Sequence, residues 1–354
     1  MLDKGLRDEA LRLAARRGMT LSAQNRKAGA LTRAVRARPA GLRPDYSGPA
    51  RRCGHYPIAD EPGMTDEMTT GFILCADDFA LTEGVSRSIL SLLEAGKLSA
   101  AGAMTNRPHW KSFAGAFAAQ AGRADLGLHL NLTCAAPLGA MQRLAANGVL
   151  PKLGDLARAA LLSGAARAEI AAEIARQLDA FEDAMGRAPD FLDGHQHVHV
   201  LPGVRGAVLA ALQGRYREGA VYLRDPADTT AAIRRRGVAI GKALVIAGLA
   251  WGLRGSALRR GIPVNRGFSG VSPFDPARDF RADLARFLVA PGPAHLVMCH
   301  PGFIDEELMG LDPVVATRPL EHAALMSFVP PQGLAMVRFA ELGLAPRSHP
   351  ALAL

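Results

Sequence analysis

Short apolar runs alternate with segments of helical periodicity from residue 72 onward. Four of the runs fit buried strands, because each is short and bounded by glycine or polar residues; they cover residues 72–76, 98–104, 126–132 and 296–299. Residues 83–95 and 165–185 instead carry apolar side chains at helical spacing, and Gly96 and Gly186 follow these two segments. Alternating strands and helices predict a parallel sheet with right-handed crossovers. About seven such units favour a single α/β domain, a TIM-like (β/α) barrel.

The first 67 residues do not share this pattern. Arg-rich pieces alternate there with Pro/Gly-rich pieces, and no strand pattern is sustained. This composition favours disorder. Met64 and Met68 precede the first strand, so the segment could equally be an artefact of the chosen start site. We therefore expect a disordered extension or artefact over residues 1–67 and a barrel domain over residues 68–345.

Charge and hydropathy argue against a nucleic-acid partner and against a membrane-spanning segment. The formal net charge is +9, but residues 1–67 hold thirteen Lys and Arg against eight Asp and Glu, about half of the excess. No alternation of basic and aromatic residues accompanies it, so we expect no nucleic-acid partner. The longest apolar segment, residues 238–253, is interrupted by Lys242 and is shorter than the ~20 residues of a membrane span. We expect it to be a helix packed on the domain, within a basic helical insertion over residues 234–260.

No two of the four cysteines form a CxxC motif. Cys75 and Cys299 lie in predicted buried strands, where cysteine behaves as a small hydrophobic residue. We expect all four to be reduced thiols in a cytoplasmic protein.

Ligand-type side chains follow the carboxyl ends of the predicted strands, where α/β proteins place their catalytic groups. The segments are GFILCADDFALTEG with Asp77 and Asp78, DLGLHLNLT with His129, FLDGHQHVHVL with His195, His197 and His199, and HLVMCHPG with His300. Because side chains alternate along a strand, Asp77 and Asp78 are not expected to point the same way. One can then bind a metal ion while the other faces the substrate.

Each of these residues also has a structural interpretation. Asp78 could cap the following helix, with Asp77 a solvated loop residue. His129 could be a hydrogen-bonded core histidine, and His300 before Pro301 a turn residue. The HxHxH run could be a simple metal-binding turn, although a continuing strand would place its three imidazoles on one face. The functional interpretation depends on the joint occurrence of all four segments.

Asp78, His129 and His195 would supply one oxygen and two nitrogen ligands. Three protein ligands with an open position are typical of a catalytic metal site. A divalent ion there lowers the pKa of bound water towards ~7 and polarises a carbonyl. Asp77 is then available as general base and His300 as the acid that protonates a leaving group. Asp193 could orient an imidazole.

The segments CADDFALTEGV, GLHLNLT, FLDGHQHVH and VMCHPGF, in this order, closely resemble the YdjC family of carbohydrate deacetylases. The resemblance covers residues 72 to about 330. It implies an irregular (β/α) barrel, one divalent metal ion (Mg or Zn) and removal of N-acetyl groups from sugars. It also implies Asp78, His129 and His195 as metal ligands, Asp77 as base and His300 as acid.

The same resemblance places Arg224 of LRDP, Phe268 and Gly270 at substrate-contacting positions. His197 and His199 are expected to support the site without binding the metal. Ala80 stands where the family usually has glycine after DDF, which alters a turn but removes no ligand.

Four functions compete at this level. The first is a metal-dependent hydrolase that deacetylates an N-acetylated saccharide. The second is a glycosidase using Asp77 and Asp193 as its carboxylate pair. The third is a non-catalytic carbohydrate- or metal-binding barrel, and the fourth is nucleic-acid binding through the basic residues 1–67. The sequence leaves a homodimer open.

Overall fold

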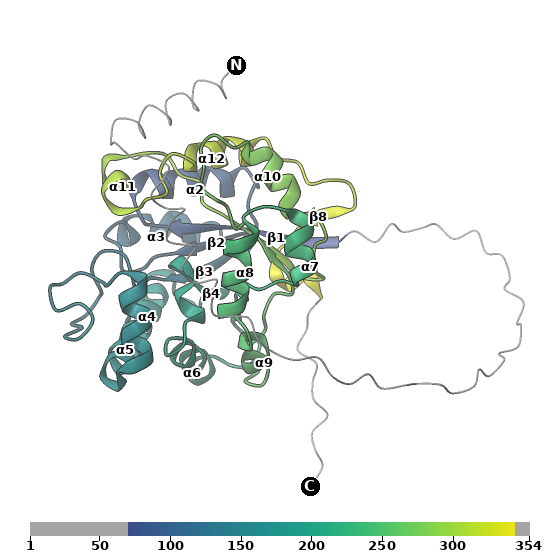
Figure 1. Ribbon diagram of the computed structural model, residues 1–354. Coiled ribbons are helices and arrows are strands. Elements are labelled where there is room, and N and C mark those ends of the chain that lie inside the picture. The colour runs from purple at the N-terminus through teal and green to yellow at the C-terminus, as the bar shows by residue number, and fades with distance from the viewer. Residues whose placement is uncertain (1–69, 344–354) are drawn as a thin grey trace, which may run out of the picture. The chain divides into compact units, whose positions relative to one another are not determined.

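The computed structural model describes residues 70–343, which form a parallel sheet with helices packed around it (Figure 1). The expectations for residues 1–67 lie outside the described residues. Eight strands make up the sheet: β1 (Thr70–Phe79), β2 (Ala100–Ala103), β3 (Asp125–Leu130), β4 (Phe191–Gly194), β5 (Tyr222–Leu223), β6 (Phe268–Ser269), β7 (His295–Cys299) and β8 (Leu334–Met336).

The strand order is β5-β4-β3-β2-β1-β7-β6, and β8 pairs with the first three residues of β1. Every ladder between these strands is parallel. The predicted α/β class and the parallel sheet are therefore confirmed. The buried β1 lies near the middle of the order, so residues at its carboxyl end have strands on both sides.

The sheet is an open half-barrel, and this corrects the expectation of a TIM-like barrel. No ladder joins its edge strands β5 and β6 among the described residues; one isolated bridge connects Leu223 of β5 to Val264, which precedes β6. Each edge strand has two residues, too few for a continuous ladder. Gly270 ends β6 with φ of 100°, and a Cβ there would lie 2.0 Å from the Met298 carbonyl oxygen. This close approach of two backbones requires glycine.

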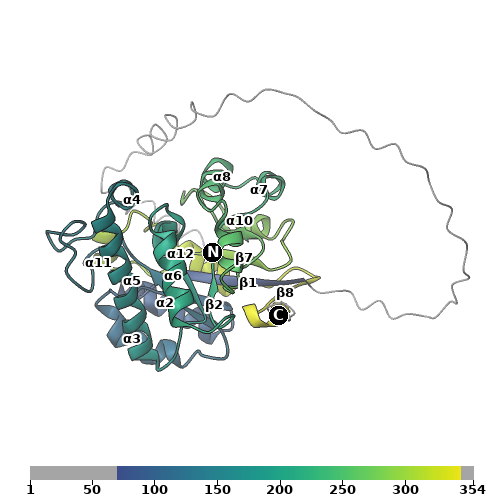
Figure 2. The same cartoon turned by 90° about the horizontal axis from the view of Figure 1, so that it is seen from below.

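The described helices are α2 (Glu83–Glu94), α3 (His109–Ala118), α4 (Leu153–Leu162), α5 (Gly164–Met185), α6 (Arg205–Arg215), α7 (Thr230–Arg236), α8 (Ile240–Leu249), α9 (Leu253–Leu258), α10 (Phe280–Phe287), α11 (Glu306–Leu311) and α12 (Arg318–Met326), with 3-10 turns η2 (His195–Val200) and η3 (Phe339–Leu342). Neighbours in the series α10, α12, α2, α3, α5, α6 contact each other. This series follows the strand order, so the helices surround the curved sheet (Figure 2).

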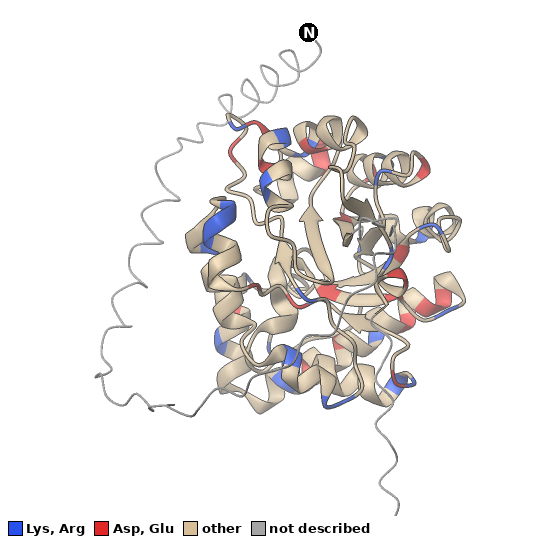
Figure 3. Cartoon of the chain, turned by 90° about the vertical axis from the view of Figure 1, so that its right-hand side faces the viewer, with Lys and Arg blue, Asp and Glu red and all other residues tan. Residues whose placement is uncertain are grey.

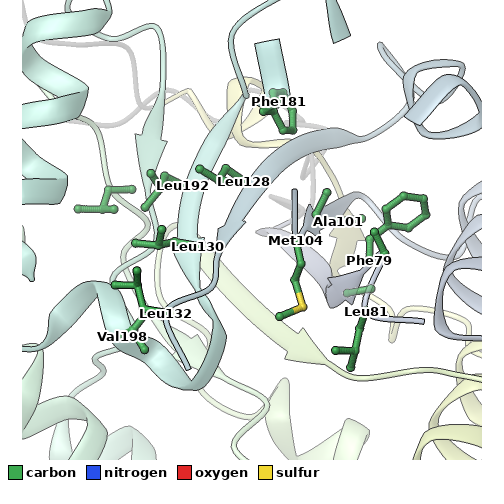
Figure 4. Close-up of a cluster of buried hydrophobic side chains, with 14 of the residues drawn as sticks. Phe79, Leu81, Ala101, Met104, Leu128, Leu130, Leu132, Phe181, Leu192 and Val198 are labelled. Atoms are coloured by element: carbon green, nitrogen blue, oxygen red, sulfur yellow. The ribbon is translucent and has the colours of Figure 1, made fainter. Parts of the chain in front are cut away.

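Side-chain alternation along β3 separates the core from the site. Leu126, Leu128 and Leu130 are fully buried and belong to the main hydrophobic core, which includes Phe181 of α5. Figure 4 shows Leu128 and Leu130 in this cluster with Leu192 of β4 and Phe79 of β1. Burial of each such side chain contributes about 1.5–3 kcal/mol. The opposite face of β3 carries His129, so burial of the leucines fixes the direction of this imidazole.

Charged residues lie mostly on the helices and loops, and the strands are largely uncharged (Figure 3). The exceptions are charged residues at the carboxyl ends of strands, among them Asp77 and Asp78 of β1 and Asp193 of β4. Among residues 70–343, no helix is both long enough and apolar enough to cross a membrane.

Candidate active site

A bulge in β1 sets the positions of the two adjacent aspartates. Ala76 pairs with Ala101 and Phe79 pairs with Ala103, so β1 has one residue more than β2 between these pairs. Asp78 has φ of 70°, a left-handed conformation that is uncommon outside glycine. Strict alternation therefore does not apply here, because a bulge re-aims side chains. Both carboxylates approach the same imidazole: the His129 Nε2 atom lies 3.2 Å from Asp78 Oδ1 and 4.0 Å from Asp77 Oδ2.

Asp78 brings two histidines together through one oxygen. Its Oδ1 atom lies 2.8 Å from His195 Nδ1 and 3.2 Å from His129 Nε2. Its Oδ2 atom accepts a 2.7 Å hydrogen bond from Arg318. Burial disfavours the carboxylate, but His195 and Arg318 outweigh burial and hold the pKa of Asp78 well below its usual range. Asp78 is therefore a buried, ionised carboxylate with one oxygen directed at two imidazoles.

His129 is oriented from behind by Asp193. The His129 Nδ1 atom lies 2.6 Å from Asp193 Oδ1, so His129 is the imidazole that Asp193 contacts. With Nδ1 engaged, Nε2 is the atom that faces the two aspartates. Burial lowers the pKa of His129, but Asp193 and Asp77 outweigh burial and raise it to about 10. The cluster therefore attracts positive charge at the position of His129.

Asp77 forms a two-point ion pair with Arg224. Its oxygens accept hydrogen bonds of 2.7 and 2.6 Å from the two terminal nitrogens of the guanidinium. One of these nitrogens also lies 2.5 Å from Asp193 Oδ2. Burial raises the pKa of Asp77, and Arg224 opposes that rise. Asp77 is thus held in one orientation and takes up a proton more readily than an exposed aspartate.

The HxHxH segment does not continue β4 as a strand. β4 ends at Gly194, and the chain turns into η2 with φ of 53° at Gln196 and 58° at His197. The three imidazoles consequently face different partners. His195 meets Asp78, whereas His199 Nε2 lies 3.0 Å from the Arg224 carbonyl oxygen and His197 packs edge-on against Phe268. The structure therefore brings one of the three, His195, to the aspartates.

His300 follows β7 and borders the same group. Its backbone N–H donates a 2.6 Å hydrogen bond to Glu321 Oε2, and its ring lies edge-on to Phe274 with centroids 5.1 Å apart. The buried Nδ1 atom has no hydrogen-bond partner among the described residues. Burial holds the pKa of His300 well below its usual range. The backbone contact, not the ring, therefore ties His300 to α12.

The three residues that the resemblance placed at the substrate are all buried in this structure. Arg224 is fully buried, and its guanidinium is occupied by Asp77, Asp193 and the Cys75 sulfur. The guanidinium of Arg224 therefore holds the carboxylates of Asp77 and Asp193 in place, and its contact with substrate stays a prediction. Phe268 is also buried, and Gly270 packs on the backbone of β7. In this structure both are framework residues of the β6 edge.

Sequence reasoning missed Arg318. It is the first residue of α12 and is fully buried, with its side chain bonded to Asp78, Asp312 and the Val314 carbonyl oxygen. No sequence motif pointed to it, because it lies beyond the last strand-end segment. A lone arginine ahead of a helix usually belongs to the surface.

The buried group fits a divalent cation. Asp78, His129 and His195 each offer one ligand atom, and these atoms all lie within 4.8 Å of one another. One carboxylate oxygen and two imidazole nitrogens form a donor set that zinc and similar ions accept. Three buried aspartates (Asp77, Asp78 and Asp193) face the two arginines 224 and 318, and the remaining negative charge holds a proton on His129 that a divalent cation would displace. The cluster of Cys75, Asp77 and Asp193 differs, because Arg224 already occupies it.

The fold and the site define a parallel α/β protein with a buried His₂Asp group at the carboxyl ends of its strands. The family described as YdjC-like protein matches residues 71–333, and the chain belongs to this family.

Relatives with assigned names resemble this chain. A chitooligosaccharide deacetylase from Yersinia pestis (strain Pestoides F) is 31% identical over 240 residues, which are 67% of this chain and 83% of the relative. A carbohydrate deacetylase from Geobacillus stearothermophilus is 35% identical over 146 residues, 41% of this chain and 56% of the relative. A carbohydrate deacetylase from Mus musculus is 33% identical over 161 residues, 44% of this chain and 50% of the relative. The matched region thus spans about half the length of the last two relatives.

One solved structure shares the fold. It is a crystal structure of a protein from Enterococcus faecalis V583 that is named for cellobiose-phosphate cleavage. The TM-score is 0.57 at 19% sequence identity, and the alignment covers 77% of this chain and 99% of that chain. At this identity the likeness shows the fold alone.

Proposed function

We propose that this protein is a metal-dependent hydrolase that removes N-acetyl groups from an N-acetylated saccharide. The observation that carries the proposal is the convergence of His129 and His195 on one oxygen of Asp78, with the second carboxylate, Asp77, beside them. The names of the relatives supply the substrate class. The proposed ligands are Asp78, His129 and His195, and the ion is Zn²⁺ or Mg²⁺.

A divalent ion at these ligands would activate water and polarise the acetamide carbonyl. Arg318 keeps Asp78 ionised and turned toward the imidazoles. Asp193 keeps Nε2 of His129 directed at the ligand group. Both contacts act before substrate arrives, so the ligand geometry costs no reorganisation during the reaction.

Asp77 is the proposed general base. It takes a proton from the attacking water as the new C–O bond forms at the carbonyl carbon. Its raised pKa favours this transfer, because a base works best when its pKa approaches the working pH. The ion pair with Arg224 fixes the orientation of the carboxylate before the water attacks.

His300 is the proposed general acid. As the C–N bond breaks, the departing sugar amine needs a proton, which the imidazole of His300 would donate. Burial holds the pKa of His300 low, so the ring must first gain that proton within the site during the reaction. The products are then the free amino sugar and acetate. The Nδ1 atom of His300 is not committed to any described neighbour, so the ring is available for this transfer.

A glycosidase is disfavoured by the pairing of Asp77 with Asp193. One nitrogen of Arg224 contacts both carboxylates, and Asp193 is fully buried and hydrogen-bonded to His129. Glycosidases require the two carboxyls to flank a sugar linkage, which a shared guanidinium prevents. A binding protein without catalysis would not require a buried base with a raised pKa.

Buried free thiols support a reducing compartment. Cys75, Cys134 and Cys299 are all free and buried. We propose the cytoplasm, where thiols stay reduced.

The function is tested by acetate release from N-acetylated chitooligosaccharides. The full chain is stripped with a chelator and reloaded separately with Zn²⁺ and Mg²⁺. We expect acetate release only after reloading, with one new free amine per acetate. Release that a chelator does not affect would contradict the metal-dependent mechanism. Sugar products with shortened chains and intact acetyl groups would instead support the glycosidase.

A further inference from the structure

Helix α8 presents an apolar face to solvent. Of its ten residues, only Ile246 is buried. The outward face of α8 carries residues at helical spacing that are all exposed: Gly241, Val245, Gly248 and Leu249. The Val245 side chain is 63% exposed, and Trp251 directly after the helix is 83% exposed. The exposed face of a helix in a water-soluble domain is normally charged or polar, so this surface is unusual.

Basic residues flank this face, and no acidic residue accompanies them. Residues 230–260 contain seven Lys and Arg and no Asp or Glu, although the net charge of the whole chain is only +9. The basic residues lie on both sides of the apolar stretch, with Arg234 and Arg235 before it and Arg259 and Arg260 after it. An apolar stripe flanked by basic residues is typical of helices that lie in the interface of an anionic membrane.

A cavity of about 740 Å³ adjoins the end of α8. Ala247, Ala250 and Trp251 form part of its lining, together with Arg235 and Arg266. Its two aspartates are already neutralised, Asp225 by Arg254 and Asp228 by Arg236. The side chains of Arg235 and Arg266 have no ion-pair partner in the described part of the chain. The cavity therefore holds these two unpaired arginines beside the exposed indole of Trp251. The arginines could bind the phosphate of a lipid headgroup while the indole contacts the acyl chain.

We propose that α8, Trp251 and the basic residues around them form a surface that docks on an anionic lipid membrane. The protein would lie on the membrane without spanning it, since none of its described helices can cross one. Val245, Leu249 and Trp251 would enter the boundary between headgroups and acyl chains. The flanking arginines would contact phosphates.

This surface borders the candidate active site. The Lys242 ammonium group on α8 lies 4.2 Å from the centroid of the Phe274 ring, and Phe274 packs against the His300 ring. Two side-chain contacts thus connect the apolar helix to the proposed acid. The membrane proposal nevertheless does not depend on the proposed chemistry, and it is tested by binding alone.

The test uses the full chain and vesicles of phosphatidylglycerol mixed equally with phosphatidylcholine. The chain has two tryptophans, and Trp110 is 2% exposed, so a blue shift of fluorescence reports on Trp251. We expect a blue shift and co-sedimentation with these vesicles, both reduced by added salt. The double variant Val245→Glu/Leu249→Glu should weaken binding on the order of tenfold or more, because charge is placed in the apolar face. Arg259→Gln/Arg260→Gln should weaken binding and its salt dependence.

The matched control is Leu161→Glu/Leu162→Glu on α4, where the two leucines are 61% and 76% exposed. These residues lie outside the proposed surface, so vesicle binding should be unchanged. Melting temperatures of all variants verify that each one folds. Absence of a blue shift, or equal binding by the α8 and α4 variants, would overturn the proposal. Dimerisation without lipid that the α8 variant abolishes, together with no vesicle binding, would assign the face to a second copy instead.

Discussion

Arg318 donates a 2.7 Å hydrogen bond to Oδ2 of Asp78, which leaves Oδ1 for the two imidazoles. This contact joins the first residue of α12 to the bulge of β1, 240 positions earlier in the chain. The guanidinium is fully buried and also bonds Asp312 and the Val314 carbonyl oxygen, so it cannot turn away. Arg318 is therefore a positioning residue for the proposed metal ligand.

Replacing Arg318 by lysine should lower the affinity for a divalent ion about 10–100-fold, the usual effect of losing a contact behind a ligand. Lysine keeps the charge but cannot bond Asp78, Asp312 and Val314 together. Metal affinity is measured by competition with a chromophoric chelator. The control is Arg215→Lys. Arg215 of α6 pairs with Glu182 of α5 and contacts none of the proposed metal ligands. Equal affinity in the Arg318→Lys and Arg215→Lys proteins would remove Arg318 from the site.

His195 and His197 provide a matched pair of imidazoles two residues apart. His195→Ala removes a proposed ligand, so metal content should fall sharply, since a site with three ligands has none to spare. His197→Ala removes an imidazole that packs against Phe268, so metal content should be nearly unchanged. Elemental analysis of the two purified proteins distinguishes them. A larger loss of metal in His197→Ala would mean that the wrong histidine has been assigned.

His300→Gln should lower turnover by about 10²–10⁴-fold, the range that a positioned acid contributes. Stability should change little, because the bond to Glu321 comes from the backbone and the ring Nδ1 has no partner to lose. Steady-state kinetics and melting temperature are measured with metal content verified. A depressed melting temperature with normal turnover would show that His300 is a turn residue beside Pro301.

Asp125 should make the free energy of unfolding depend on pH. It is buried at the start of β3 and accepts a hydrogen bond from the Phe339 N–H, and burial raises its pKa to about 6. The folded state thus binds the proton more tightly than the unfolded state, whose pKa is about 3.9. Stability from this group is present below about pH 4 and is lost as the pH rises to about 6, by up to about 3 kcal/mol.

The measurement is urea unfolding of the wild type and Asp125→Asn across this pH range. The variant keeps an oxygen for Phe339 but has no proton to lose. We expect it to gain stability relative to wild type as the pH rises, and to keep that advantage above pH 6. A constant difference across the range would show that Asp125 titrates as it does in the unfolded chain.

The positions of the strands that carry the site could be predicted, because each of them appears in the sequence as a short local run of apolar residues. His129 is an example, since the alternating leucines of β3 show both the strand and the face that the imidazole occupies. The bulge at Asp78 and the positive φ angles of Gln196 and His197 could not be predicted, because each depends on backbone conformations that tertiary contacts impose. The ion pairs of Arg318 with Asp78 and of Arg224 with Asp77 were missed for another reason: the paired residues lie 240 and 147 positions apart. The sequence also could not predict that the sheet stays open, because closure of the barrel depends on how far two short edge strands extend.

The most direct test of the account compares Asp77→Asn with Asp78→Asn, two isosteric changes at adjacent residues. Metal content and acetate release are measured on the same zinc-reloaded samples, and melting temperature confirms that both variants fold. Asp77→Asn should retain its metal and lose turnover by about 10²–10⁴-fold, because the amide cannot accept the proton. Asp78→Asn should lose the metal itself. Full metal occupancy in Asp78→Asn, or wild-type turnover in metal-loaded Asp77→Asn, would contradict the assignment of ligand and base.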